Sequence, residues 1–173
     1  MKYRHILRCS LTTLGLLAFA ASMFCPVYGI ETGTESRIYT CGDVLVEGVL
    51  AFPKDVARLV VTGETHYRMV WLLLDLLLFS SAYSVLRGRA GRKTHVAMFI
   101  AVITIICFYL WSPDYGWAWD WSEGTMTRKL YGYHLWLAGF VSVYAAVALE
   151  RYCRGKEETG RAPKTDMKDN RIN

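Results

Sequence analysis

The fold is decided by residues 69–111, which read MVWLLLDLLLFSSAYSVL, then the basic link RGRAGRKTH, then VAMFIAVITIICFYLW. Each apolar run comes close to the roughly 20 residues that a helix needs to cross the hydrocarbon core of a membrane. The short link allows little more than a tight turn. The two runs therefore predict a pair of antiparallel spans, and the basic residues of the link place it in the cytoplasm.

Two further apolar runs, one toward each end of the 173-residue chain, extend the pattern to four. The predicted spans are residues 9–29, 69–86, 95–112 and 131–149. The sequence therefore predicts an all-α membrane protein with four transmembrane helices, formed by residues 1–150. The polar segment 151–173 is predicted to be a cytoplasmic tail that is disordered beyond its first turn or two.

The first run has two interpretations. Its basic start and the small residues Ala18 and Ala20 also fit a cleaved signal peptide. The apolar stretch continues past Ala20 through Val27, which is longer than an export signal needs. An uncleaved anchor is therefore the preferred interpretation.

Basic residues give the four spans a direction, because Lys and Arg are retained on the cytoplasmic side. Fourteen of the 20 fall before the first span, between the second and third, or after the fourth. They are Lys2, Arg4, Arg8, Arg87, Arg89, Arg92, Lys93, Arg151, Arg154, Lys156, Arg161, Lys164, Lys168 and Arg171. Both termini are predicted to be cytoplasmic. The net charge of +5 is explained by topology and the lipid bilayer, with no need for a nucleic-acid partner.

All six tryptophans fall on the side that this assignment makes the outer one. Indole rings favour the headgroup boundary, so these residues are predicted to be interfacial aromatics. They are Trp71, Trp111, Trp117, Trp119, Trp121 and Trp136. The alternation from Trp117 to Trp121 favours an extended segment with its indoles on one face. Membrane anchoring is preferred there over an aromatic cage for a cation or sugar.

The first outer loop, residues 30–68, is too long and too apolar for a simple connection. Its centre, residues 42–52, predicts a short interfacial helix that Asp43 caps and Pro53 ends. We expect this loop to fold as a cap on the membrane surface over the bundle. Ordinary packing on its own helices is the preferred interpretation, and a docking surface is the alternative.

Asp75 needs an explanation, because placing an unpaired carboxylate inside a membrane span costs on the order of several kcal/mol of free energy. It must be protonated, paired or in contact with water. His134 is the first candidate partner, and Tyr109 and Tyr133 also offer hydrogen bonds. Together they form a candidate intramembrane polar site. A structural acid that fixes helix packing is preferred over a proton or cation site, because a single carboxylate without a relay is weak support for transport.

Small residues spaced by four predict where helices approach closely in lipid. These residues are Ala18 and Ser22 in the first span, Ser80 and Ser84 in the second, and Ala138, Ser142 and Ala146 in the fourth. The same faces would also fit a homodimer interface or a larger membrane complex.

The cysteines and histidines indicate no catalytic, metal or cofactor site. Cys25 and Cys41 both fall on the oxidising side and could form a disulfide. The length and four spans resemble those of bacterial disulfide-generating quinone reductases, which need a cysteine pair in each outer loop. Here the first loop has only Cys41 and the second has none, so that activity is excluded. The four histidines show no metal-ligand spacing.

Three segments carry a resemblance to a broad group of small, uncharacterised bacterial inner-membrane proteins. They are FCPVY (24–28), the apolar cap 44–52 and YGYHLWLA (131–138). The resemblance implies fold and location in the inner membrane. The prediction is therefore a non-enzymatic inner-membrane protein with a structural, accessory or interaction role. The alternatives are an immunity protein against a pore-forming bacteriocin, whose four-span outline is similar, and a small ion- or proton-coupled transport component using Asp75.

Overall fold

The computed structural model describes the backbone of residues 2–32, 35–63, 67–111, 125–129 and 131–160, and the side chains of residues 3–27, 38–63, 69–107 and 131–156. These residues form five helices and one small sheet. The helices are α1 (Lys2–Ser22), α2 (Cys41–Thr62), α3 (Tyr67–Leu86), α4 (Arg92–Trp111) and α5 (Tyr131–Gly160), and the strands are β1 (Pro26–Thr32), β2 (Glu35–Thr40) and β3 (Thr125–Lys129).

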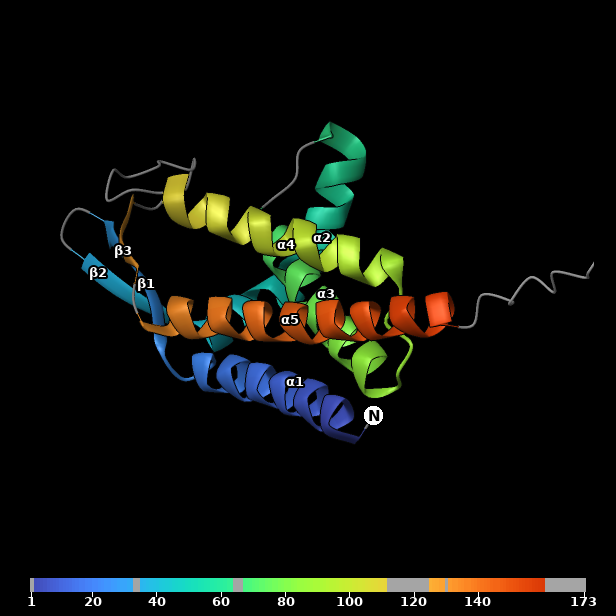
Figure 1. The fold of residues 1–173 in the computed structure, drawn as a ribbon. Coiled ribbons are helices and arrows are strands. Elements are labelled where there is room, and N and C mark those ends of the chain that lie inside the picture. The colour runs from blue at the N-terminus through green and yellow to red at the C-terminus, as the bar shows by residue number, and fades with distance from the viewer. Residues whose placement is uncertain (1, 33–34, 64–66, 112–124, 130, 161–173) are drawn as a thin grey trace, which may run out of the picture.

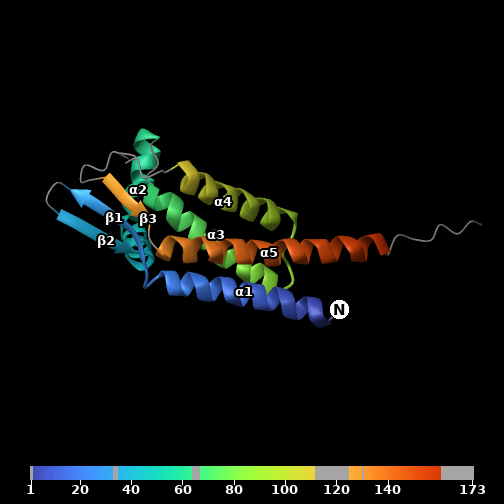
Figure 2. The same cartoon turned by 60° about the vertical axis from the view of Figure 1, so that its left-hand side comes forward.

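Helices α1, α3, α4 and α5 run along a common bundle, and α5 contacts the other three (Figure 1). The start of α1 and the end of α5 lie at one end, which we call the terminus end, and the three strands lie at the other, the sheet end (Figure 2). The core lies between the helices, where large apolar side chains are fully buried. They include Leu78, Val85, Met98, Ile105, Phe140 and Val147.

Three of the described helical segments are long and apolar enough to cross a membrane: Tyr3–Ser22, Met69–Leu86 and Tyr131–Lys156. The chain therefore has the composition of a membrane protein. The third predicted span, 95–112, coincides with α4, whose described side chains end at Cys107. Membrane crossing by α4 stays a prediction.

The described residues are mostly helical, as predicted, and one small three-stranded antiparallel sheet accompanies the helices. Its strand order is β2-β1-β3, with Tyr28 opposite Tyr39 on one side and Lys129 on the other. The first predicted span, 9–29, is therefore wrong at its end, since α1 stops at Ser22 and β1 begins at Pro26. Proline has no backbone N–H and disfavours helix in the residue before it, which explains the early stop.

Helix α2 begins where predicted but is twice as long as expected. Thr40 is its N-cap, and a capping box joins the Thr40 hydroxyl to the Asp43 backbone N–H at 3.1 Å and the Asp43 carboxylate to the Thr40 N–H at 2.8 Å. The helix continues through Pro53 to Thr62, and Gly63 ends it with a left-handed φ of 72°. The prediction that Pro53 ends the helix is wrong, because packing outweighs the one hydrogen bond that proline removes.

Helices α1 and α5 approach each other closely at Gly15 and Gly139. A Cβ atom added at Gly15 would lie 2.8 Å from the Gly139 carbonyl oxygen and 2.8 Å from Cγ2 of Val143. A Cβ at Gly139 would lie 2.9 Å from the Gly15 carbonyl oxygen. Both positions therefore require glycine, as expected where backbones meet in lipid.

Only some of the small residues that were predicted to lie between helices are buried there. Ser22 and Ala146 are buried, whereas Ala138 and Ser80 are exposed. A spacing of four does not reveal the glycine pair, because the pair consists of one residue on each helix. A single crossing point leaves no periodic pattern in the sequence.

Helix α5 extends beyond the predicted end of the fourth span at residue 149. It continues to Gly160, about one turn further than the one or two turns of order expected after Glu150. Glu150 and Arg154 account for the extension, because they are tied to other parts of the bundle at the terminus end. Residues 161–173 of the predicted tail lie outside the described residues.

Candidate functional site

Asp75 lies buried in α3 toward the sheet end and is held by a side chain of α5. The indole N–H of Trp136 donates a hydrogen bond of 2.8 Å to Oδ1 of Asp75. Asp75 is 5% exposed and Trp136 is 3% exposed. A buried carboxylate thus has a neutral donor, which lowers the cost of its desolvation without bringing a second charge into the bundle.

Aromatic rings surround this hydrogen bond. The ring of Trp71 meets that of Trp136 edge-on, with ring centroids 4.7 Å apart. The ring centroids of Phe140 and Trp136 lie 4.8 Å apart. Tyr133 packs 5.7 Å from Trp136, and its hydroxyl donates to the backbone oxygen of Ile105 at 3.0 Å. The cluster therefore joins α3, α4 and α5 into one packed unit.

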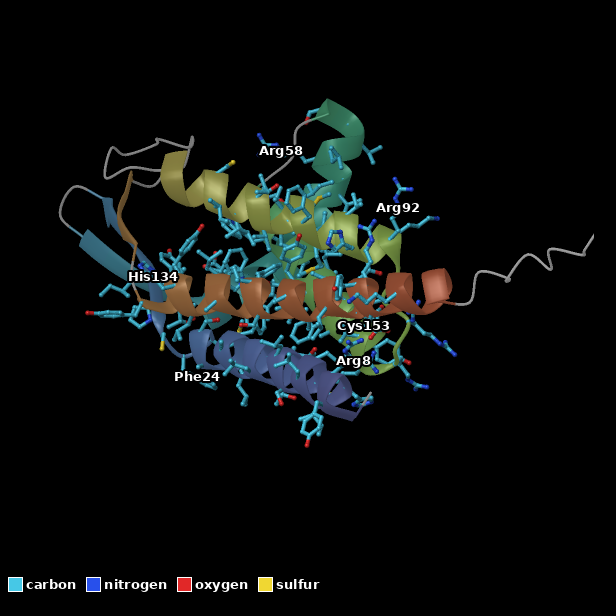
Figure 3. All side chains as sticks on the ribbon, in the orientation of Figure 1. Arg8, Phe24, Arg58, Arg92, His134 and Cys153 are labelled. Carbon is cyan, nitrogen blue, oxygen red and sulfur yellow. The ribbon has the colours of Figure 1, made fainter. Side chains whose placement is uncertain are left out.

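The structure gives Asp75 a different hydrogen-bond donor from the one expected. His134 lies at the sheet end and is exposed (Figure 3). Residues two apart on a helix point about 200° apart, so His134 and Trp136 face opposite sides of α5. Of the candidate polar site, Asp75 and Tyr133 each contact Trp136, whereas the side chain of Tyr109 lies outside the described residues.

The ring and the N–H of Trp136 are both used inside the bundle, and its place at the membrane boundary stays a prediction. Trp71 is half-buried against it. The remaining predicted interfacial tryptophans fall outside the described side chains. They are Trp111, Trp117, Trp119 and Trp121.

Cys41 and Cys25 are free thiols, so the predicted disulfide is not formed in the structure. Cys41 is buried at the start of α2, close to Ser22. Burial raises the pKa of Cys41 to about 12, and the negative charge of Asp75 adds to this, against a hydrogen bond with Ser22 that lowers it. The thiol is therefore protonated at neutral pH and is a poor nucleophile.

A second polar cluster, at the terminus end, was not predicted. Glu150 of α5 is 3% exposed and forms ion pairs with Arg8 of α1 and, at 3.2 Å, with Arg154 one turn further along α5. Arg154 also donates to the backbone oxygen of Gly88, in the link between α3 and α4. Gly88 has a φ of 62°, a conformation that favours glycine. The cluster joins α1, α5 and the basic link.

The sequence held one signal for this cluster. Glu150 is a single acid at the end of an apolar run, on the side of the protein where positive charges gather. Its partner Arg8 is far away in the chain, and its position before the first span indicates a topological role alone. Only the antiparallel packing of α1 on α5 brings the two together.

The described side chains hold no group of three or more His, Cys, Asp or Glu placed to bind a metal ion. Comparison of the chain with protein-family models, with curated proteins and with solved structures finds no match. The arrangement of the side chains is therefore the basis for assigning a function.

Proposed function

We propose that this protein is a multi-pass protein of the bacterial inner membrane that serves as a non-enzymatic accessory subunit, binding another membrane protein through α2. In this arrangement α1, α3, α4 and α5 are the four spans, the terminus end faces the cytoplasm, and α2 lies at the outer membrane boundary. The basic residues near the terminus end support this orientation, because positive charge is retained in the cytoplasm.

The observation that carries the proposal is a second apolar face on α2. One face of α2 packs on the bundle and buries Cys41, Gly48 and Asp55, which recur every seven residues. The opposite face is apolar and exposed, and Leu50 and Val61 reach 76% and 83% exposure. At helical spacing this stripe consists of Val46, Val49, Leu50, Val60 and Val61.

Charged residues run along one edge of α2, between its two apolar faces. Glu47, Lys54 and Arg58 recur at intervals of seven and four, so they share that edge. A helix of this kind fits a membrane boundary, where the charged edge reaches water and both apolar faces are covered. The bundle covers one face. We assign the other to a partner, since contiguous exposed apolar surface marks an interaction site.

The test is the size of the complex extracted in a mild detergent from cells that express the full chain. The wild-type protein should migrate in a discrete complex larger than the 19.7 kDa chain or its small multiples. The double variant Leu50→Glu, Val61→Glu should release the chain from that complex. The matched control is Phe24→Glu, which adds a charge at an exposed apolar position of the sheet end outside α2 (Figure 3).

Equal migration of the wild type and the α2 double variant would exclude binding through this face. A partner that proves to be the membrane helices of a pore-forming toxin would make the accessory role one of immunity. The gene neighbourhood is an independent check, because a toxin gene beside this one is expected only for that role.

The second candidate function is ion or proton transport, and the buried carboxylate of Asp75 is the observation that favours it. Asp75→Asn separates the two, because asparagine keeps an oxygen that accepts from Trp136 and removes the titratable group. Transport predicts loss of an ion-dependent phenotype at unchanged protein level. A structural acid predicts a functional protein.

A further inference from the structure

A groove of about 480 Å³ lies between α4 and α5 at the terminus end. Its lining residues are His95, Ala148, Arg151, Tyr152, Gly155 and Lys156. Figure 1 shows α4 and α5 side by side there, at the end where the basic link joins α3 to α4. The groove opens on a different side of α5 from the Glu150 cluster, since consecutive residues are about 100° apart on a helix.

The groove presents an ordered cation. The Nη1 atom of Arg151 lies 3.1 Å from Nδ1 of His95, and Nε2 of His95 lies 3.5 Å from the hydroxyl of Tyr144. A histidine nitrogen that faces a guanidinium must be the acceptor, so neutral His95 orients Arg151 without competing for its charge. Among the described side chains, Arg151 has no carboxylate partner. A guanidinium has five N–H donors, and the bond to His95 uses one.

The position of Lys156 adds a second positive charge to the same groove. Its Nζ lies 4.9 Å from the centre of the Tyr152 ring, so these two lining residues form a cation–π pair. Two cations from successive turns of one helix suit an oxyanion with several acceptor atoms. The geometry of a phosphate group meets this requirement.

Apolar surface continues from the groove toward the middle of the bundle. Phe99 of α4 packs 6.1 Å from the ring of Tyr144 and is 48% exposed. Ile103, one turn further along α4, and Val141 of α5 are also exposed. The site is therefore amphipathic, with cations at the membrane boundary and an apolar track along the two helices.

We propose that this groove binds an anionic phospholipid, whose headgroup phosphate contacts Arg151 and Lys156 and whose acyl chain lies along Phe99. Basic pockets between membrane helices on the cytoplasmic side suit such headgroups. The site is separate from the apolar face of α2, and it holds whether or not α2 binds a partner.

The test is native mass spectrometry of the full chain released from detergent after addition of phosphatidylglycerol or phosphatidylcholine. Phosphatidylglycerol should be retained and phosphatidylcholine should not. Arg151→Gln and Lys156→Gln should each weaken retention about fivefold, the effect of one basic residue near a lipid headgroup. The matched control is Arg89→Gln, which removes an exposed positive charge at the same end, outside the groove, and should leave retention unchanged.

Three results would overturn the lipid site. One is equal retention of the two lipids, and another is equal loss of phosphatidylglycerol in the Arg89 variant and in both groove variants. The third is displacement of phosphatidylglycerol by inorganic phosphate at equal concentration, which would assign the groove to a soluble anion. Retention of the lipid against inorganic phosphate supports the apolar track.

Discussion

Asp75 and Glu150 are two buried carboxylates near opposite ends of the bundle, and their surroundings differ. Asp75 accepts a hydrogen bond from a neutral indole among aromatic rings, whereas Glu150 pairs with two guanidinium groups. Trp136 and Glu150 lie about 21 Å apart along α5, at 1.5 Å per residue. The difference follows from the neighbours of each acid: the contacts described around Asp75 come from Trp136 and the aromatic rings packed on it, whereas Glu150 lies at the arginine-rich terminus end.

The largest expected effect comes from replacing Glu150, the acid that pairs with both Arg8 and Arg154. Glu150→Gln should destabilise the protein by about 3 kcal/mol, because Arg8 is 19% exposed and loses its counter-charge. This value is at the lower end of what removing one partner of a buried ion pair usually costs, since Arg154 is 41% exposed and can reach water. Denaturant titration in detergent micelles measures the loss. The double variant Arg8→Met, Glu150→Leu should recover most of it, and no recovery would show that the two residues do not act as a pair.

The second prediction concerns the hydrogen bond between Trp136 and Asp75 toward the sheet end. Trp136→Phe keeps an aromatic ring but leaves the Asp75 carboxylate without its donor, which should cost about 2 kcal/mol. Asp75→Asn keeps the acceptor and should cost much less. The same titration compares the two. A larger loss in Asp75→Asn than in Trp136→Phe would mean that the charge, and not the hydrogen bond, stabilises this end.

The third prediction concerns the helix crossing between the two ends. Gly139→Ala should destabilise by about 1–2 kcal/mol, because the added methyl group meets the backbone oxygen of Gly15 and α1 must move. Gly155→Ala is the control, since a Cβ there has no atom within 4 Å. Thermal unfolding in micelles distinguishes them. Equal melting temperatures of the two variants would contradict the close contact.

The smallest effect is at the cap of α2, outside the two carboxylate sites. Hydrogen bonds from the backbone and side chain of Thr40 lower the pKa of Asp43. A lowered pKa in the folded state means that the ionised acid contributes stability above its unfolded pKa of about 3.9 and loses it as the pH falls below that value. Asp43→Asn should keep a capping side chain while removing this part of the pH dependence. Parallel pH profiles for variant and wild type would exclude the effect.

The sequence located Asp75 because a charge inside an apolar run is visible without a structure. The identity of its donor was not visible, since Trp136 satisfies the rule for an interfacial residue as well as that for a buried donor. The rotation of α5 decides between them. A face of a helix can be read from periodicity, whereas its rotation relative to a neighbour depends on contacts such as those at Gly15.

The hairpin of β1 and β2 was not predicted, because residues 26–29 were included in the first predicted membrane span. The segment from Val27 to Thr40 contains β-branched and tyrosine residues on both sides of Gly33, which is a hairpin signal. The third strand, β3, follows the chain from α4 and has little local signal. Its place in the sheet depends on pairing with β1, which is distant in the sequence.

The pairing of α1 with α5 has a consequence for biosynthesis. Helix α1 leaves the ribosome well before α5, yet the glycine crossing and the Arg8–Glu150 ion pair both require the two together. Until α5 is inserted, the Gly15 face of α1 and the charge of Arg8 have no partner on that helix. Closure of the bundle is therefore a late step that depends on a contact between distant parts of the chain, and such contacts form slowly. A pulse of synthesis stopped between α4 and α5 should yield a protease-sensitive intermediate.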